Sequence, residues 1–464
     1  MKSKIISIIF VSLCVCICAV PSVCMTFAPT NSTTENKRLK QLPSLTENDG
    51  VNLDYLSELG EWFGDHYAFR NAMVDADSHI QGDVFSVSNA DTVVKGNNGW
   101  LYYSDTLNDY LGKKTLSDRA VFNIAHNLAV IQDYVEARKA KFVFTVAPNK
   151  NSLYDENMPY YYSRKASEKR NINSLLPELK KEKINYTDLF GVFKDSGETL
   201  YLKRDSHWNN KGAMLAFSEI MKGLDRDFTD YSKQKVKRLK TEIGDLGSML
   251  YPNSAQPEWN YYYDNDGFEY STPTKSVEDA YIETSSDGSG KLLMYRDSFG
   301  NTLLPFFACD FKKACFSKAA PYTLEENMNS LLPDCVVIEK VERNLDDLAS
   351  DPPLISAPEI KEKTEFSREK TNSTLNVSES ATDRSYYLIS GVADSRYVTT
   401  SAEFYVRLKT DVGDRYFKTF NISDENGDNG YSLYLRSGML KSGDEIELIA
   451  VNGSKAAAIA SASV

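Results

Sequence analysis

Three residue types that nucleophilic acyl chemistry requires occur in two short segments of the chain. Ser298 lies in Lys291-Leu-Leu-Met-Tyr-Arg-Asp-Ser-Phe-Gly300, where a short apolar run precedes polar residues, a glycine and an apolar helical segment. A strand that turns sharply into a helix lifts a serine hydroxyl above the sheet edge and directs the first helical amides at the group attacked. The alternative interpretation is ordinary turn and helix-capping chemistry.

A base and a carboxylate stand earlier in the chain. His207, one of four histidines, follows Asp205 by two residues, after an extended run at Thr199–Leu202 and before a helical segment. A serine nucleophile needs a base for its proton and a carboxylate that orients the imidazole. The alternative is that Asp205 caps the helix and His207 is a surface or packed side chain. Considered together, Ser298, His207 and Asp205 predict a catalytic triad.

These residues also carry a family resemblance. Asp205-X-His207-Trp208, followed by Asn-Lys-Gly-Ala, resembles the signature of bacterial alginate O-acetyltransferase-like proteins in the SGNH hydrolase superfamily, and more closely the DHHW family. The other matching segments, in chain order, are Gly96–Tyr102, Val146–Lys150, Gly244–Leu246, Met294–Gly300 and Pro333–Asp334 through Glu342–Arg343. The chain departs from the family name at Ser206, where a second histidine is implied, and it lacks the Gly-Asp-Ser of ordinary SGNH hydrolases.

The resemblance implies an extracytoplasmic O-acetyltransferase that acts on a cell-surface or secreted polysaccharide through an acetyl-serine intermediate. It also implies a partner, a separate multi-pass membrane acyltransferase that supplies the acetyl group. Two alternatives stay open. The same triad can serve a carbohydrate acetylesterase, in which water takes the acetyl group, or the chain can be a non-catalytic surface glycan-binding or scaffold protein.

Further site residues are expected around the triad. The backbone amides of Ser298 and Gly300 are the expected oxyanion donors, and Asn149, after another predicted strand, is a candidate side-chain donor. Motif matches alone place Lys150, Arg296 and Tyr102 in the wall of the substrate site.

Composition excludes several other functions. The net charge is −12 and no basic stripe is present, which argues against nucleic acid as a partner. The histidines and cysteines lack the spacing of metal ligands, and no glycine-rich phosphate loop occurs, so neither a metal nor a cofactor is expected.

The N-terminus predicts export. A short positive segment and the apolar run Ile5–Cys24 make residues 1–24 a signal peptide or an uncleaved signal anchor. Residues 25–44 are polar and are expected to be a spacer. The body of the protein is therefore expected at the cell surface, secreted or anchored, with membrane contact only through the N-terminus.

Residues 45–350 alternate predicted strands with predicted helices, which indicates an α/β fold with a three-layer, SGNH-hydrolase-like parallel sheet. The triad residues follow predicted strands, where sites of such sheets lie. A long amphipathic helix is expected after Ser117, with His126 off its apolar stripe and therefore solvated.

Two further regions complete the chain. Residues 236–289 look irregular and rich in tyrosine, which suits either a platform for sugar rings or the packing of a long insertion. Residues 351–384 are expected to be a linker, and residues 385–464, with short alternating runs between turn clusters, a small β-sandwich domain.

Overall fold

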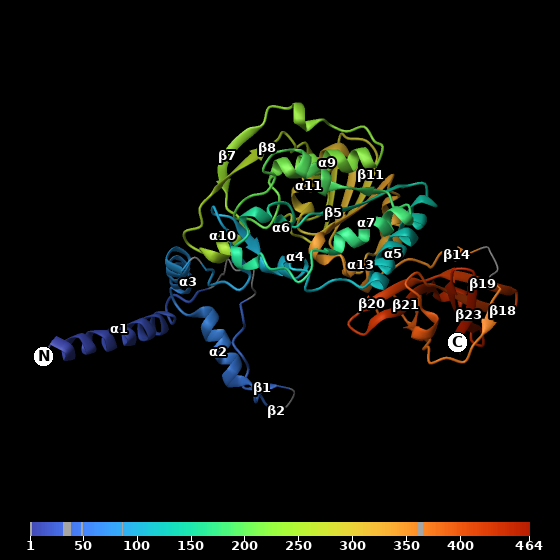
Figure 1. The fold of residues 1–464 in the computed structure, drawn as a ribbon, viewed down its shortest axis with the longest axis horizontal. Helices are drawn as coiled ribbons and strands as arrows, with labels where there is room; N and C mark the ends of the chain where they lie inside the picture. Colours follow the sequence, from blue (N-terminus) through green and yellow to red (C-terminus); the bar gives the residue numbers. More distant parts are fainter. Residues whose placement is uncertain (1, 31–38, 48–49, 86, 361–364) are drawn as a thin grey trace.

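The computed structural model describes residues 2–30, 39–47, 50–85, 87–360 and 365–464. The chain starts with the apolar helix α1 (Lys2–Cys24), which extends away from the body of the protein (Figure 1). In these described ranges, Lys4–Cys24 is the one helical stretch long and apolar enough to cross a membrane. Both a signal peptide and a membrane anchor have these properties. Residues 31–38 of the expected spacer lie outside the described residues.

A seven-stranded sheet forms the centre of the body. Five neighbouring strands are parallel; at one edge β10 pairs antiparallel with β12, and β9 pairs antiparallel with β10. In spatial order the strands are β6 (Tyr186–Thr187), β5 (Lys141–Ala147), β13 (Cys335–Val341), β11 (Lys291–Tyr295), β12 (Lys313–Ser317), β10 (Tyr281–Ser286) and β9 (Phe268–Tyr270). The predicted α/β fold is confirmed, with a mixed rather than wholly parallel sheet.

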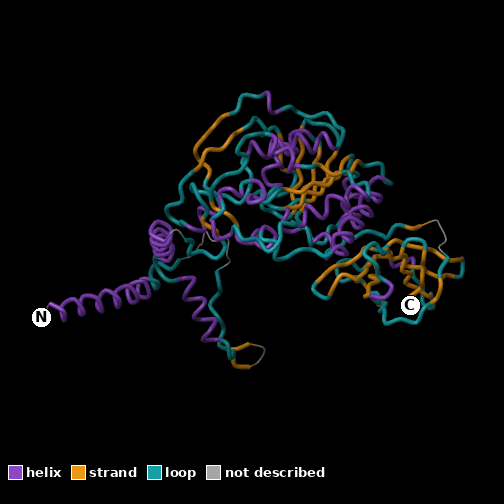
Figure 2. Tube along the Cα trace, in the orientation of Figure 1, coloured by secondary structure: helices purple, strands orange, loops and turns teal. Residues whose placement is uncertain are grey.

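Helices cover both faces of this sheet, so the region has three layers (Figure 2). Successive residues of β11 point to opposite faces: Met294 packs in one apolar core and Leu293 and Tyr295 in the other. The first face is covered by α8 (Leu189–Asp195), α9 (Asn210–Gly223) and α11 (Gly300–Asp310). The second is covered by α5 (Asp118–Glu136), α7 (Asn171–Lys181), α12 (Leu324–Leu331) and α13 (Asp347–Ser350).

Two sequence expectations were wrong in this region. Residues 236–289 are not irregular, since they contain β9, β10 and an antiparallel pair, β7 (Lys237–Glu242) with β8 (Glu258–Tyr262). β7 is exposed along most of its length and β8 has a single buried residue, so the sequences of this pair lack a clear apolar alternation. Conversely, Thr199–Leu202 contributes no strand to the sheet; Tyr201 makes an isolated bridge to Trp208, which closes the turn that contains Asp205 and His207.

The C-terminal region is a β-sandwich, as expected. One sheet has the order β14 (Glu359–Ile360), β19 (Gly413–Lys418), β18 (Glu403–Thr410), β22 (Glu445–Asn452), β23 (Lys455–Ser463) and β15 (Ser367–Arg368). The other has the order β16 (Asn376–Glu379), β17 (Tyr386–Val392), β21 (Gly427–Arg436) and β20 (Phe420–Asp424). Apolar residues of both sheets share one core. The predicted domain boundaries stay predictions, and residues 361–364 lie outside the described residues.

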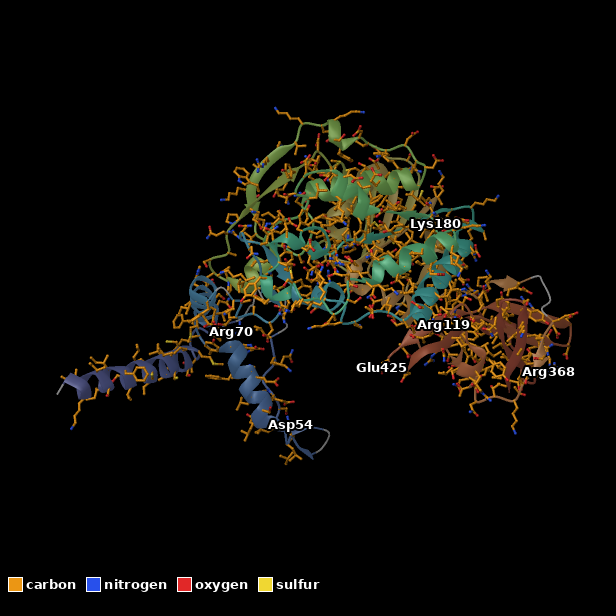
Figure 3. All side chains as sticks on the ribbon, in the orientation of Figure 1. Asp54, Arg70, Arg119, Lys180, Arg368 and Glu425 are labelled. Atoms are coloured by element: carbon orange, nitrogen blue, oxygen red, sulfur yellow. The ribbon has the colours of Figure 1, made fainter. Side chains whose placement is uncertain are left out.

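Helix α5 joins the two regions through a polar interface. Its first turn carries Arg119, which lies between the body and the C-terminal strands (Figure 3) and donates to the carbonyl of Ala402 at 2.6 Å. His126 is buried rather than solvated, because its Nε2 lies 3.1 Å from the carbonyl of Thr419 in the C-terminal region. Burial lowers the pKa of His126. The expectation for His126 was wrong because an apolar stripe marks only one buried face of a helix.

Asn127 links three separate elements at this interface. Its buried side chain donates to the carbonyls of Leu348 and Asn421 at 3.0 and 2.9 Å, and it accepts the N–H of Asn421 at 2.9 Å. It therefore ties together α5, α13 and β20.

Replacing Asn127 with Ala is expected to lower the free energy of unfolding by about 2–3 kcal/mol, because buried peptide groups lose their partner. Chemical denaturation of both proteins measures this change. The matched control is Glu136→Ala, at an exposed position of the same helix, with an expected change within about 0.5 kcal/mol. Equal losses in the two variants would contradict the role given to Asn127.

Candidate active site

Ser298 stands at a sharp corner between β11, which ends at Tyr295, and α11, which begins at Gly300. Two carboxylates fix this corner. Asp297 accepts the N–H of Phe299 at 2.9 Å and the N–H of Val341 at 2.6 Å, and buried Glu339 accepts the N–H of Asp297 at 3.1 Å. The corner is thus joined to the end of β13. Burial and the negative charge of Asp297 raise the pKa of Glu339 well above its usual value.

Asp205 and His207 meet Ser298 at this corner. His207 Nε2 lies 2.9 Å from Ser298 Oγ, and His207 Nδ1 lies 2.8 Å from Asp205 Oδ1. The same carboxylate oxygen accepts the backbone N–H of His207 at 2.8 Å. With its proton on Nδ1, the imidazole donates to Asp205 and accepts from the serine hydroxyl. The imidazole side chain is 23% exposed, so a substrate can approach it.

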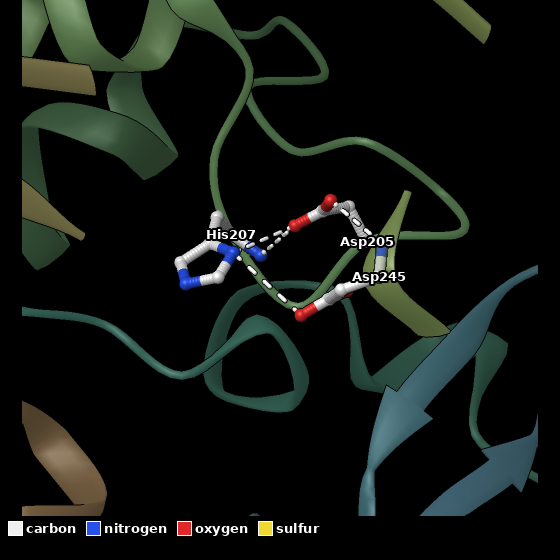
Figure 4. A group of neighbouring side chains, drawn as sticks. All are labelled: Asp205, His207 and Asp245. Carbon is white, nitrogen blue, oxygen red and sulfur yellow. Dashed lines mark hydrogen bonds and ion pairs between the residues drawn. The ribbon is translucent and has the colours of Figure 1, made fainter. Parts of the chain in front are cut away.

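A second carboxylate, Asp245, lies beside this pair (Figure 4). Its Oδ2 is 3.8 Å from His207 Nδ1, and its backbone N–H donates to Asp205 Oδ2 at 3.0 Å. It also accepts the backbone N–H of Ser206 at 2.7 Å, as well as the Ser206 hydroxyl. Asp245 therefore holds Asp205 and the turn around it. Sequence reasoning gave it no role, and the only signal was its place in the matching segment Gly244–Leu246.

Asp205, His207 and Asp245 are also, within the part of the chain that the structure describes, the one group of side chains close enough to share a metal ion. Their nitrogen and oxygen atoms are already engaged with one another and with backbone N–H groups. The arrangement therefore fits a hydrogen-bonded acid–base site better than a metal centre.

The three groups shift one another's pKa. Burial disfavours the ionised form of Asp205, but the hydrogen bond from His207 and its charge outweigh burial and lower the pKa of Asp205. Burial likewise disfavours the imidazolium, yet the hydrogen bond to Asp205 and its charge raise the pKa of His207 above 6.5. Burial and the charge of Asp205 raise the pKa of Asp245. Asp205 is thus the ionised partner that stabilises the imidazolium.

Packing and one hydrogen bond fix the turn against the corner. The Phe299 ring lies edge-on to the His207 ring at 4.8 Å and to the Trp208 ring at 4.9 Å. Trp208 Nε1 donates to Thr302 Oγ1, on α11, at 2.6 Å. Because Phe299 and Trp208 are both buried, the spacing between His207 and Ser298 is set by the core.

Lys150, expected in the substrate wall, lies buried behind the triad instead. Its ammonium group donates to the carbonyls of Leu202 and Lys203 at 3.1 and 3.0 Å, and to that of Asp205. Burial lowers its pKa to about 8. The Lys150 side chain therefore holds together the backbone of the turn that contains Asp205. Its positive charge lies on the buried side of this turn and interacts with the Asp205 carboxylate.

The other two expected wall residues are also buried and bound to the protein itself. Tyr102 donates its hydroxyl to the carbonyl of Tyr154 at 2.6 Å. Arg296 donates to the carbonyl of Val277 at 2.8 Å and to the side chain of Asn301. In this structure they support loops of the site rather than present a surface to a substrate.

The expected oxyanion donors follow the ends of β11 and β5, which lie on either side of β13 in the sheet. In the described residues, the backbone N–H groups of Ser298 and Gly300 have no hydrogen-bond acceptor. Asn149 follows β5, and its N–H donates to Glu342, just after β13, at 2.8 Å. Its side-chain amide is buried and has no hydrogen-bond partner there. Unpaired donors of this kind are available to an oxyanion.

Arg343 is a charged neighbour that sequence reasoning did not assign to the site. Its guanidinium lies 5.9 Å from the centre of the Phe299 ring and 5.3 Å from that of Tyr103, and its charge disfavours the His207 imidazolium. It makes no hydrogen bond or ion pair with any residue that the structure describes. The only indication in the sequence was the place of Arg343 at the end of the matching segment that runs to Glu342–Arg343, just after a predicted strand.

The aromatic residues of 236–289 do not form one platform. Trp259 is half exposed, and the guanidinium of Arg238 lies 5.0 Å from the centre of its ring, whereas Tyr263 packs against the core. Trp259 lies next to Glu258, whose carboxylate accepts the backbone N–H groups of Lys203 and Arg204, before Asp205. Since successive strand residues point to opposite faces, Trp259 faces away from the triad turn.

Comparison with known proteins identifies a related family. Residues 93–285, less than half of the chain, match the model of the family described as "SGNH hydrolase-like domain, acetyltransferase AlgX". The matched range contains Asp205, His207 and Asp245 and ends before Ser298. A search of curated proteins finds no match. The predicted family resemblance is confirmed, and the reaction class in the family's name is the one expected.

Solved structures with a similar fold come from several bacteria. Bacillus cereus PatB1 is 17% identical over 55% of this chain and 96% of its own, with a TM-score of 0.45. A DHHW family protein from Eubacterium siraeum is 16% identical over 55% and 95%, with a TM-score of 0.40. Pseudomonas aeruginosa AlgX is 14% identical over 74% and 86%, with a TM-score of 0.37. None of these scores reaches 0.5, so no property of these proteins is carried over to this chain.

Replacing Lys150 with Met is expected to lower the free energy of unfolding by about 2 kcal/mol, because three backbone carbonyls lose their donor. Thermal or denaturant unfolding measures this change. The matched control is Lys141→Met, on the same strand–loop segment but half exposed, which is expected to change stability by less than about 0.5 kcal/mol. A Lys150→Met protein as stable as the control would contradict the anchoring role.

Proposed function

We propose that this protein is an extracytoplasmic O-acetyltransferase that acetylates a polysaccharide through an acetyl-serine intermediate. The observation that carries the proposal is the hydrogen-bonded chain from Ser298 Oγ through His207 to Asp205, with distances of 2.9 and 2.8 Å. This arrangement suits double displacement, in which one base serves two proton transfers. The match to an acetyltransferase family model supports the same reaction class.

In the first half-reaction, His207 Nε2 takes the proton from Ser298 as the hydroxyl oxygen attacks the carbonyl carbon of an acetyl donor. The backbone N–H groups of Ser298 and Gly300, together with the Asn149 amide, are the proposed donors to the oxyanion. Collapse of the tetrahedral intermediate breaks the bond to the donor alcohol, which receives the proton from His207. The acetyl group remains on Ser298.

In the second half-reaction, a sugar hydroxyl attacks the acetyl-serine while His207 takes its proton. The serine then leaves as the alcohol and recovers that proton. Asp205 stays ionised throughout and stabilises the imidazolium that forms in each half. If water attacks instead of the sugar, the same triad releases acetate, so the acceptor decides between transferase and esterase.

The apolar helix α1 supports a location outside the cytoplasm, with the protein either secreted or held at the membrane. A membrane-embedded acyltransferase that delivers the acetyl group is the proposed partner, because the acetyl donors of the cell lie on the other side. The helix and the family resemblance, rather than the triad, support these parts of the proposal.

The direct test is incubation of the full chain in detergent with 4-nitrophenyl acetate and a panel of oligosaccharides. Mass spectrometry of the sugars is expected to find acetylated products with the wild type. Ser298→Ala is expected to lose at least about 10³-fold of the rate. Acetate as the only product would show that the enzyme is an esterase rather than a transferase. An undiminished rate in Ser298→Ala would exclude the triad as the catalytic group.

The raised pKa of His207 sets the pH dependence. The base must be neutral, so kcat/KM is expected to fall as the pH drops through a value above 6.5. Asp205→Asn removes the charge that raises this pKa, so the acid limb should move to lower pH and kcat should fall by about 10²–10⁴-fold. Asp411→Asn, in an exposed turn, is the control and should leave the acid limb and kcat unchanged. An acid limb at the same pH in Asp205→Asn would contradict the pairing.

A further inference from the structure

A buried glutamate at the end of β13 holds the backbone of the segment that contains Asn149. Glu342 follows β13 directly and is 1% exposed. Its Oε2 accepts the backbone N–H of Asn149 at 2.8 Å and the hydroxyl of Ser152 at 2.6 Å. Asn149 is itself 1% exposed, and neither polar atom of its side chain has a hydrogen-bond partner among the described residues. Glu342 therefore fixes the backbone from which this unpaired amide projects.

The residues on either side of this amide contact the triad turn and the serine corner. Directly after it, the ammonium group of Lys150 donates to the carbonyl of Asp205. Directly before it, the carbonyl of Pro148 accepts the hydroxyl of Tyr201, whose ring lies 6.2 Å from that of Phe299. Because the segment is bonded to the site at both ends, a shift of its backbone moves the amide relative to the serine and the imidazole.

Glu342 also meets a second buried carboxyl group, that of Asp109 in α4 (Leu107–Tyr110). The two side chains are hydrogen-bonded to each other. Oε1 of Glu342 and Oδ2 of Asp109 receive no N–H or O–H from any other residue that the structure describes. An ionised carboxylate is only an acceptor, so two carboxyl groups form a hydrogen bond only when one of them carries a proton. This contact therefore requires one proton between the two groups.

The surroundings of the pair favour this proton. Burial and the charge of Asp109 raise the pKa of Glu342 to about 7, and burial raises the pKa of Asp109. The positive charge of Arg170 opposes both shifts. Tyr186 and Tyr201 also face Glu342, and burial raises the pKa of each phenol, so both stay neutral. The pair is therefore the group on this side of the site that changes its charge near neutral pH.

A cavity of about 270 Å³ borders both carboxyl groups and gives their proton a route to solvent. The other charged side chains along it offset one another. Asp346 is paired with Lys114 at 2.8 Å, Asp347 is paired with a lysine of β13, and Asp105 and Arg343 carry opposite charges. The net charge on this side of the site therefore changes when the pair gains or loses its proton.

We propose that Glu342, through the proton that it shares with Asp109, is a positioning residue that holds the Asn149 amide in place for the oxyanion. The proposal rests on the proposed function, because it needs an oxyanion to form at Ser298. With one proton the pair carries a single negative charge. When that proton leaves to solvent, a second negative charge stands beside the groups that stabilise the oxyanion, so the reaction slows.

The first test is steady-state kinetics of the full chain in detergent with 4-nitrophenyl acetate. Glu342→Leu removes the acceptor for Asn149 and should lower kcat about 10²-fold, with KM changed by less than about threefold. In the Asn149→Ala background the same change should cost less than about threefold, because both variants act through one amide. Wild-type kcat in Glu342→Leu, or losses that simply multiply in the double variant, would overturn the proposal.

The second test is the pH profile of Glu342→Gln. A glutamine accepts the N–H of Asn149 and donates to Asp109, but it does not titrate. Wild-type kcat is expected to fall as the pH rises through about 7. Glu342→Gln should keep kcat within about threefold below that pH and lack the fall. Glu326→Gln, exposed on α12, is the control and should keep the wild-type profile. A fall that persists in Glu342→Gln would overturn the proposal.

Ser298→Ala separates failure of this proposal from failure of the proposed function. If Ser298→Ala loses the rate and Glu342→Leu does not, the triad stands and the role of Glu342 is overturned. If Ser298→Ala keeps the rate, the proposed function fails and this role fails with it. The shared proton is also measured without catalysis, from the infrared C=O stretch of a protonated carboxyl group in Ser298→Ala below pH 7. Adding Glu342→Gln should remove that stretch, and an unchanged spectrum would overturn the proposal.

Discussion

The hydrogen bond between His207 Nε2 and Ser298 Oγ joins two segments that are far apart in the chain. Ser298 is held by a strand-to-helix corner, and His207 by a turn outside the sheet. A hydroxyl is a weak nucleophile unless a base stands within hydrogen-bond reach. The packing of both segments therefore sets the distance between the two side chains, and the buried Phe299 ring, which contacts the rings of His207 and Trp208, fixes it.

Buried and partly buried polar groups next to the triad stabilise this arrangement. Lys150 gathers three carbonyls of the turn, Asp245 donates to Asp205, and Asp297 is joined to Glu339 and to the end of β13. Buried charges are costly unless each has several partners. Here each of these contacts fixes a backbone segment, so the cost of burial is offset by a rigid site in which little reorganisation is needed when charge develops on the imidazole.

Much of the fold and of the candidate site could be predicted from the sequence, because the patterns that indicate them are local. Short apolar runs marked β5, β11 and β13, and residue types at strand ends marked Ser298 and Asn149. Other features depend on partners distant in sequence. Asp245 acts through its backbone N–H, and His126 is buried by a sheet that begins hundreds of residues later.

The central claim is that Ser298 carries the acetyl group between donor and acceptor. Rapid acid quenching of the full chain with an acetyl donor, followed by peptide mass spectrometry, tests it most directly. The account predicts one acetyl group on the peptide that contains Ser298, which disappears when an accepting sugar is added and forms far more slowly in His207→Ala. An acetyl group on a different residue, or none on Ser298 while the reaction turns over, would contradict it.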